Sequence, residues 1–597
     1  MSLLDLASLV LAPTATKEGK VYSAIPDTGD GDMTFTRGSA ATRVNSEGLI
    51  EKERANLSKY SQTGASWGSS GVSIDSTTTA DFLGGNDAVT FTASGGVAAF
   101  VYSDNTISVS SGIVYSGSIY VKNVDADFVQ LTFGTSGFGS SQYQNFDLTT
   151  GTLGNGSNID AQIEDLGNGW YRISLTAQAI SSTTSALVVV IVPSSTSSRL
   201  QSATSGQTLI AFASQFEQGL VAQPYIETTT TAVYEGITDD VPRVDYSGGG
   251  CPSLLLEPSA TALNEQSEYY DTYWTKENIT ISSNDTTSPE GVANASKISE
   301  TASTTYFALS KGFTISSGSN HTISVFAKAD ERNFLIIRTN LLGSNLNTTF
   351  NLSTGVVTYN AHTSASIESY SDGWYRCSIT ASSSSTSLNM AILISNADVT
   401  SNVLPTYLGV AGSGFHIYGI NVMASGYLQS YIPTYGTSAT RTSELCSKTS
   451  ATALIGQAEG TLFADVYFDG VSQSTSRIPL FVRTSGSNTG YAFINFYLGK
   501  LNCALRVAGV TMFDSLQSGT LSAGRYKIAM GYKSGDTVIY MNGVQMATDT
   551  DTFGTTNYSE AYVGCSASGV QLGDGLNQAL LFTTRLSNSN LATLTSL

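Results

Sequence analysis

Short runs along the chain alternate apolar with polar residues and are separated by turn-forming residues. Residues 117–122 (Gly-Ser-Ile-Tyr-Val-Lys) and 171–176 (Tyr-Arg-Ile-Ser-Leu-Thr) both follow this alternation. A period of two is typical of strands with one buried face. The dipeptides Asn155-Gly156, Asn168-Gly169 and Asp372-Gly373 favour the tight turns of hairpins. The pattern predicts an all-β chain built of β-sandwiches.

The chain also repeats itself, and this is the most informative feature of the sequence. Residues 146–151 (Phe-Asp-Leu-Thr-Thr-Gly) recur as residues 350–355 (Phe-Asn-Leu-Ser-Thr-Gly), and residues 169–177 recur as residues 373–381. All four tryptophans fall at two equivalent places in the two copies: Trp67 with Trp274, and Trp170 with Trp374. We infer a tandem duplication of one jelly-roll-like module.

The spacing of apolar positions along the chain changes near residue 459. Residues 461–468 and 537–544 are typical of strands, and the second run continues into the hairpin turn Asn542-Gly543. Residues 586–597 are expected to form one short closing helix with Ser587 as its N-cap. These features predict a third β-sandwich at the C-terminus.

The repeats and the change of spacing divide the chain into five parts. They are a leader (1–55), the first repeat (56–235), a connector (236–260), the second repeat (261–442) and the C-terminal module (456–597). The apolar start, residues 1–13, is interrupted by Asp5 and has no Lys or Arg before it, so it is a poor secretion signal. We expect it to form a short helix or a docking segment.

Composition and charge exclude several classes of function. Charged residues make up 13% of the chain, and 47 Asp and Glu against 28 Lys and Arg give a net charge of −19. A chain this acidic, without a basic cluster, is repelled by nucleic acid and by anionic membranes. No stretch has the ~18 apolar residues that a membrane span needs. We therefore expect no nucleic-acid partner and no membrane insertion.

The cysteines and histidines are few and scattered. The five cysteines lie far apart and form no Cys-x-x-Cys pair, and the three histidines are equally dispersed. Zinc sites and disulfide frameworks both need closer spacing than this. We expect free, mostly buried thiols.

Several segments carry a resemblance to a known family. Residues 35–45 (Phe-Thr-Arg-Gly-Ser-Ala-Ala-Thr-Arg-Val-Asn) resemble a leader of tailed-bacteriophage structural proteins, which is followed there by segments similar to residues 242–246 and 253–258. Residues 372–376 (Asp-Gly-Trp-Tyr-Arg) and 430–434 (Ser-Tyr-Ile-Pro-Thr) resemble carbohydrate-binding-type jelly rolls of the same fibre proteins. The C-terminal module resembles a concanavalin A-like, laminin-G-type domain.

The first repeat departs from this family pattern. Its end, residues 223–228, lacks the Ile-Pro-Thr of the second repeat. It also separates the leader from the connector, which look like two parts of one continuous unit. We infer that the first repeat is an extra module inserted into a simpler fibre.

The resemblance implies a virion structural protein, a tail or head fibre or adhesin that contacts glycans of the host surface. It implies that the leader attaches the chain to other virion proteins, and that the protein is made in the host cytoplasm and exposed on the particle. Exposed edge strands invite pairing, and association around a threefold axis both covers them and multiplies weak glycan contacts. We therefore expect a homotrimer.

Aromatic side chains near the start of each repeat are candidates for stacking on sugar rings. These are Trp67 in the first repeat and Trp274 and Tyr270 in the second. The alternative is that they pack in the core or at a module junction.

An acidic alternation in the leader is a candidate metal site. The carboxylates of Asp27, Asp30 and Asp32 have the hard oxygen atoms that calcium prefers. The segment lacks the trailing Glu of an EF-hand loop, so a solvated turn is the alternative. Apart from this structural calcium, we expect no cofactor.

Motifs for catalysis are absent from the sequence. It contains no Gly-x-Ser-x-Gly, no His-Glu-x-x-His and no P-loop, and no catalytic residue transfers from the resembled family. We expect that the protein is not an enzyme. The alternatives to a glycan-binding fibre are a structural tail or capsid-decoration component without a glycan ligand, a bacterial surface polysaccharide-binding protein, and a capsule depolymerase.

Overall fold

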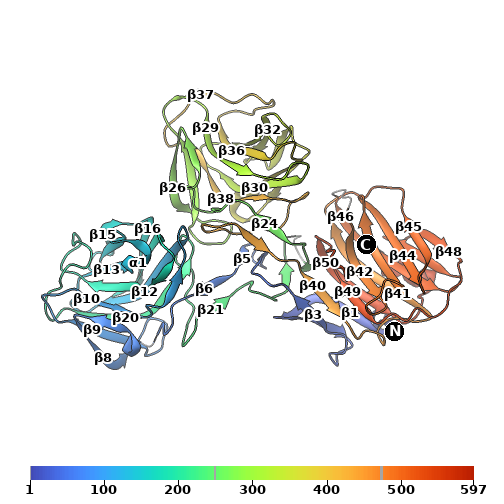
Figure 1. Cartoon of the computed structure of the whole chain (residues 1–597), viewed down its shortest axis with the longest axis horizontal. Helices are drawn as coiled ribbons and strands as arrows, with labels where there is room; N and C mark the ends of the chain where they lie inside the picture. The colour runs from blue at the N-terminus through green and yellow to red at the C-terminus, as the bar shows by residue number, and fades with distance from the viewer. Residues whose placement is uncertain (1, 63, 248–250, 471–474) are drawn as a thin grey trace.

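The computed structural model describes residues 2–62, 64–247, 251–470 and 475–597. Three β-sandwich bodies make up the molecule (Figure 1). The α-helices of the described residues are two short ones, α1 (Thr135–Phe138) and α2 (Asn588–Leu594). The predicted all-β fold is confirmed. No helix in these ranges is long and apolar enough to cross a membrane.

The first repeat is a sandwich of two six-stranded antiparallel sheets. One sheet has the order β7 (Gly68–Ser70), β10 (Ala99–Tyr102), β19 (Leu187–Ile191), β13 (Phe128–Phe133), β14 (Tyr143–Asp147), β15 (Thr152–Ser157). The other has the order β8 (Val72–Thr79), β9 (Ala88–Ala93), β20 (Thr208–Gln218), β12 (Val114–Asn123), β17 (Trp170–Gln178), β16 (Asp160–Gly167). Apolar side chains of both inner faces form one core.

The second repeat has the same strand order, as the duplication in the sequence predicts. Its first sheet runs β25 (Thr275–Glu277), β29 (Phe307–Thr314), β36 (Ser387–Ser395), β31 (Phe334–Thr339), β32 (Leu346–Asn351), β33 (Val356–Asn360). Its second sheet runs β26 (Ile279–Thr286), β27 (Ala295–Glu300), β38 (Gly414–Met423), β30 (Asn320–Ala329), β35 (Trp374–Ser382), β34 (Ser364–Ser369).

Three of the four expected turn dipeptides close hairpins. Both residues of Asn168-Gly169, Asp372-Gly373 and Asn542-Gly543 have positive φ, which Asn, Asp and Gly adopt most easily. The turn expected at Asn155-Gly156 is wrong, because these residues lie inside β15. The chain bends earlier, where the carboxylate of Asp147 accepts hydrogen bonds from the backbone N–H groups of residues 149 and 150.

The third sandwich joins the two ends of the chain in one continuous hydrogen-bonded sheet. Its strand order is β45 (Val510–Leu516), β44 (Lys500–Val507), β43 (Tyr491–Tyr497), β42 (Arg477–Arg483), β49 (Glu560–Val563), β40 (Leu445–Lys448), β3 (Met33–Thr36), β2 (Lys20–Ile25), β1 (Leu9–Lys17), β50 (Gly575–Phe582), β41 (Glu459–Phe468), β46 (Gly524–Lys533), β47 (Thr537–Met541), β48 (Val544–Asp549). The connector adds β22 (Arg243–Asp245) and β23 (Ser253–Leu255), which pairs with β50. Three leader strands therefore belong to this sheet.

The start of the chain docks onto the C-terminal module. A 3-10 turn at Leu4–Leu6 precedes β1, whose residues pair with β50. Leu9, Leu11 and Phe35 lie in the same apolar core as side chains of the C-terminal strands. The closing helix is confirmed: α2 begins after Ser587, whose hydroxyl accepts a hydrogen bond from the backbone N–H of Asn590. Figure 1 shows both chain ends in this module.

Each repeat is held on a two-stranded stem. The stem of the first repeat pairs β6 (Arg54–Asn56) with β21 (Val233–Glu235), and that of the second pairs β24 (Ala260–Ala262) with β39 (Ala439–Arg441). The short hairpin of β4 (Thr42–Val44) and β5 (Ile50–Lys52) lies before the first stem. Both repeats are thus insertions between segments of the third sandwich, and the connector residues 248–250 lie outside the described residues.

The expected state of the cysteines is confirmed. All five are free thiols, and those at 377, 446, 503 and 565 are buried in apolar cores. Cys251 in the connector is exposed.

A fully buried ionic cluster joins the leader, the connector and the end of the second repeat. We call its five residues the ionic junction: Arg37, Arg243, Glu257, Arg441 and Glu444. Glu444 accepts one hydrogen bond from Arg37 at 2.9 Å and two from Arg243, one of them 2.7 Å long. Glu257 lies 2.7 Å from both Arg243 and Arg441.

The carboxylates of the ionic junction are ionised despite their burial. Burial by itself raises the pKa of Glu257, but the neighbouring Arg441 and Arg243 outweigh it and hold the pKa at about 2. Buried charges cost several kcal/mol each unless they are paired and hydrogen bonded. The junction therefore stabilises only the arrangement in which all three segments meet.

Neutralising Glu444 is expected to destabilise the protein strongly. Glu444→Gln leaves Arg37 and Arg243 without their shared counter-charge in a buried site, which costs about 3–5 kcal/mol. The control is Glu235→Gln in the first stem, because Glu235 pairs with Arg54 at the surface and is 45% exposed. Its loss should cost below about 1 kcal/mol. Denaturant unfolding checks both, and equal effects of the two variants would contradict the role of the junction.

Candidate functional site

The aromatic residues selected from the sequence lie inside the modules. Trp67 stacks on Phe91 and donates its indole N–H to a backbone carbonyl at 2.7 Å. Trp274 packs against Tyr270 and donates to a backbone carbonyl at 2.9 Å. Trp67, Trp274 and Tyr270 are 4%, 3% and 1% exposed. Their role in this structure is core packing, and a ligand surface has to be sought elsewhere.

The three leader aspartates point to different partners. Asp32 accepts a hydrogen bond from the backbone N–H of Ser23 at 3.0 Å and lies 3.1 Å from the ammonium of Lys20. Asp30 accepts from the hydroxyl of residue 28, and Asp27 is exposed. Within the described residues, no group of three or more His, Cys, Asp or Glu is placed to hold a metal ion.

A cavity of about 360 Å³ opens on the outer face of the first sheet of the second repeat. Its residues follow from strand register, because alternate residues of neighbouring strands share a face. One row across the sheet is Thr275, Ser310, Ala391 and Arg338. The next row is Glu277, Ala308, Leu393 and Ile336, of which the first three line the cavity. The floor is apolar, with Leu404 beside Ala308 and Leu393.

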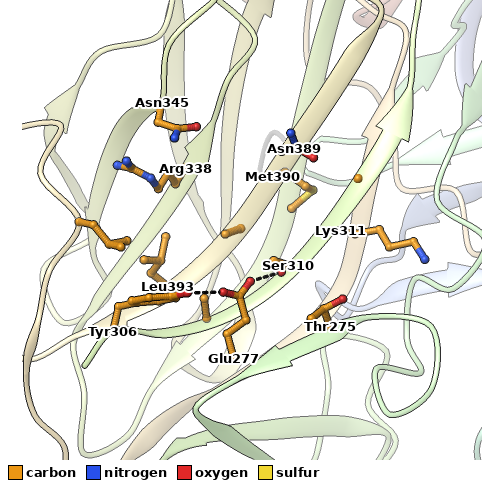
Figure 2. A pocket seen from close by; sticks show the side chains of 14 residues that line it. Thr275, Glu277, Tyr306, Ser310, Lys311, Arg338, Asn345, Asn389, Met390 and Leu393 are labelled. Atoms are coloured by element: carbon orange, nitrogen blue, oxygen red, sulfur yellow. Dashed lines mark hydrogen bonds between the residues drawn. The ribbon is translucent and has the colours of Figure 1, made fainter. Parts of the chain in front are cut away.

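Polar side chains surround this apolar floor (Figure 2). The carboxylate of Glu277 accepts hydrogen bonds from the hydroxyl of Tyr306 at 2.7 Å and from that of Ser310. This hydrogen bond to Glu277 raises the pKa of Tyr306. In Figure 2, Arg338 and Asn345 lie across the cavity from Glu277.

Of the two cations near the cavity, Arg338 lies across it from Glu277, whereas the side chain of Lys311 points away from it (Figure 2). Arg338 donates one hydrogen bond to a side-chain carbonyl at 2.7 Å and another to the backbone carbonyl of Asn402 at 2.9 Å. The ammonium of Lys311 lies 3.9 Å from the ring centroid of Tyr273 and donates to that residue's carbonyl. The cavity therefore presents one acceptor group and several donors around an apolar floor.

The first repeat fills the same face with aromatic rings. Phe100 and Tyr102 have the strand register of Ala308 and Ser310, and their rings stack 6.5 Å apart. The ring of Tyr102 lies directly over Gly68, where an added Cβ atom would come within 2.3 Å of it. The two copies therefore share a backbone but differ in whether this face is hollow.

Sequence reasoning missed this cavity because it searched for aromatic residues. The informative feature of the sequence was the presence of small residues at 308 and 310, where the first copy has two aromatic residues. Even so, Glu277 and Arg338 come from strands that are far apart in sequence, so only the sheet brings them together.

Comparisons with known proteins give weak structural similarity only. A scan of protein-family models and a search of curated proteins returned no match. Among solved structures, the CBM40 of the Ruminococcus gnavus IT-sialidase matches with 14% identity over 24% of this chain and 84% of that chain, at a TM-score of 0.20. The CBM22-1–CBM22-2 tandem of Paenibacillus barcinonensis Xyn10C matches with 16% identity over 62% and 97%, at a TM-score of 0.21.

Domains LG4-5 of the mouse laminin α1 chain match with 9% identity over 54% of this chain and 90% of that chain, at a TM-score of 0.16. These neighbours are β-sandwich proteins, as this chain is. Similarity at this level says nothing about the ligand of this chain.

A buried carboxyl in the first repeat is titratable near neutral pH. Glu217 on β20 is 2% exposed and accepts hydrogen bonds from Gln215 at 2.6 Å and from the backbone N–H of Gln223 at 3.0 Å. Burial raises its pKa to about 7. Such a pKa suits an acid–base catalyst, but Glu217 does not line the cavity over Ala308 and Leu393. Its effect is on stability.

The stability of the first repeat is expected to fall as the pH rises from about 4.5 to about 7. In this window the folded state keeps the proton of Glu217 while the unfolded state loses it, so ionisation favours unfolding. Glu217→Gln should remove this dependence and stabilise the repeat at pH 8 by up to about 3 kcal/mol. Unfolding at pH 5 and pH 8 checks this, with the exposed Glu164→Gln as control. A wild-type stability that is flat across the window would contradict it.

Proposed function

We propose that the second repeat is a glycan-binding module and that one sugar ring lies in the cavity over Ala308 and Leu393. A sugar ring has an apolar C–H face and a rim of hydroxyl groups, and binding sites match this with an apolar floor and a few placed polar groups. The single observation that carries the proposal is the difference between the copies, since the face filled by Phe100 and Tyr102 in one is hollow and polar-rimmed in the other.

The rim residues have separate roles in this proposal. The Glu277 carboxylate accepts hydrogen bonds from sugar hydroxyls, and its own bonds to Tyr306 and Ser310 fix its orientation. Arg338 donates to hydroxyl oxygens of the ligand. One cation opposite one carboxylate favours an uncharged sugar.

The proposal also includes the biological role of the whole chain. We propose a virion fibre rather than a bacterial surface polysaccharide-binding protein, because the segments that carry the phage resemblance supply Arg37, Arg243 and Glu257 of the ionic junction. The segments that resemble phage proteins are therefore the ones whose residues connect the modules. The homotrimer and the virion partners stay predictions, which light scattering and mass spectrometry of purified particles test.

Filling the cavity with the side chains of the first repeat is expected to abolish binding. The double variant Ala308→Phe, Ser310→Tyr copies Phe100 and Tyr102 and occupies the space of the sugar, with a loss of at least about tenfold in affinity. The measurement is an array of bacterial surface polysaccharides with neutral and sialylated oligosaccharides, followed by calorimetry on the strongest binder.

The matched control is Phe100→Ala, Tyr102→Ser in the first repeat, which should keep wild-type affinity. Thermal unfolding of each variant shows whether its fold is intact. Undiminished binding by the filled variant, or no binding of any arrayed glycan by the wild type, would overturn the assignment of this cavity.

A further inference from the structure

A second and larger cavity lies between modules. Its volume is about 830 Å³, and its walls come from the leader, the connector, the second repeat and the C-terminal module. We call it the inter-module cleft. On the second repeat it is lined by β34 and β35, which belong to the sheet opposite the one that carries the proposed sugar site. The two cavities are therefore separate.

A ladder of polar pairs runs along the wall formed by the second repeat. The cross-strand pairs are Glu368 with Arg376, Ser366 with Ser378, and Ser364 with Thr380, and all six residues line the cleft. Successive pairs on one face are two residues apart, so the ladder extends over about 14 Å at the usual rise of a strand. This length fits a chain of linked sugar rings better than a single ring.

Both members of the charged pair in the ladder have polar atoms that make no hydrogen bond within the described residues. The carboxylate of Glu368 makes no hydrogen bond or ion pair within the described part of the chain, and it is exposed to the cleft. The guanidinium of Arg376 is 4% exposed, and its Nε has no hydrogen-bond partner there. Buried donors without partners are rare in folded proteins, and a bound ligand is one reason for them.

The opposite wall provides an aromatic ring. Tyr467 on β41 lines the cleft and is 48% exposed. A phenol ring combines an apolar face for a sugar ring with a hydroxyl group, at little cost in conformational entropy.

Most of the other charged side chains of the cleft are paired. Glu257 pairs with Arg441 at 2.7 Å, Arg43 pairs with Glu51 at 2.8 Å, and Asp469 and Asp574 share Arg477, at 2.6 and 3.0 Å. Asp245 accepts hydrogen bonds from the backbone N–H groups of Val44 and Ser247. Charges held in this way favour an uncharged, hydroxyl-rich ligand over a polyanion or a polycation.

We propose that the inter-module cleft binds an extended segment of a neutral polysaccharide. Glu368 and Arg376 hydrogen bond its hydroxyl groups, and Tyr467 stacks on one ring. The hydroxyl pairs Ser366–Ser378 and Ser364–Thr380 continue these contacts along the ladder. Glu257 belongs to both the cleft and the ionic junction, so the junction holds the two walls at a fixed separation. This site is independent of the cavity over Ala308.

The test is calorimetry of the full chain with a size series of neutral linear gluco-, xylo- and manno-oligosaccharides. Affinity for one of these series should rise with chain length until the cleft is filled. Glu368→Gln and Tyr467→Ala, which alter opposite walls, should each weaken the longest oligomer by about tenfold. Both residues are exposed, so the fold should persist, as thermal unfolding would show.

The matched control is Glu164→Gln in the first repeat. Glu164 is the counterpart of Glu368, opposite Arg172 on β16 and β17, and does not line the cleft. It should bind the longest oligomer like the wild type.

Loss of oligomer binding in the filled variant alone would place the ligand in the other cavity and overturn the inter-module site. Wild-type affinity in both Glu368→Gln and Tyr467→Ala, or no binding of any oligomer, would overturn it too. If Glu368→Gln and Tyr467→Ala lose oligomer binding but filling the cavity over Ala308 changes no glycan affinity, only the proposed function of that cavity is overturned.

Discussion

The arrangement of the modules depends on the ionic junction. Its three guanidinium groups and two carboxylates come from the leader, the connector and the segment after the second repeat, and all are removed from water. Charges in such a place are tolerable only when every one is paired, so a partly assembled junction is unfavourable. The cluster is therefore stable only when all of these segments are correctly assembled. It also explains why the leader and the connector are parts of one unit although a whole repeat separates them.

The two repeats are insertions between the segments that form the third sandwich and the ionic junction. The leader strands β1 and β3 complete the sheet of the C-terminal module, and each repeat leaves that body on a pair of short antiparallel strands. A module on such a stem has a core separate from that of the third sandwich. The second repeat also forms a wall of the inter-module cleft.

The duplication gives one backbone two different outer faces. Both copies have the same order of strands, and their inner faces are equally apolar. They differ on an outer face, where the first copy has Phe100 and Tyr102 and the second has Ala308 and Ser310. Because core packing does not restrain an outer face, its residues are free to change while the fold is kept.

The sequence by itself determined the local features and the repetition. Alternation predicted the strands, Asn168-Gly169 and Asn542-Gly543 their turns, and Ser587 the closing helix, because each depends on a few neighbouring residues. The repeated motifs predicted two modules of one fold. Only the tertiary structure decided which aromatic rings are buried, as with Trp67 and Trp274, and which strands the leader joins. It alone brought Glu277 to Arg338 and Glu368 to Tyr467, since burial and cavity shape arise from contacts between segments that are far apart in the chain.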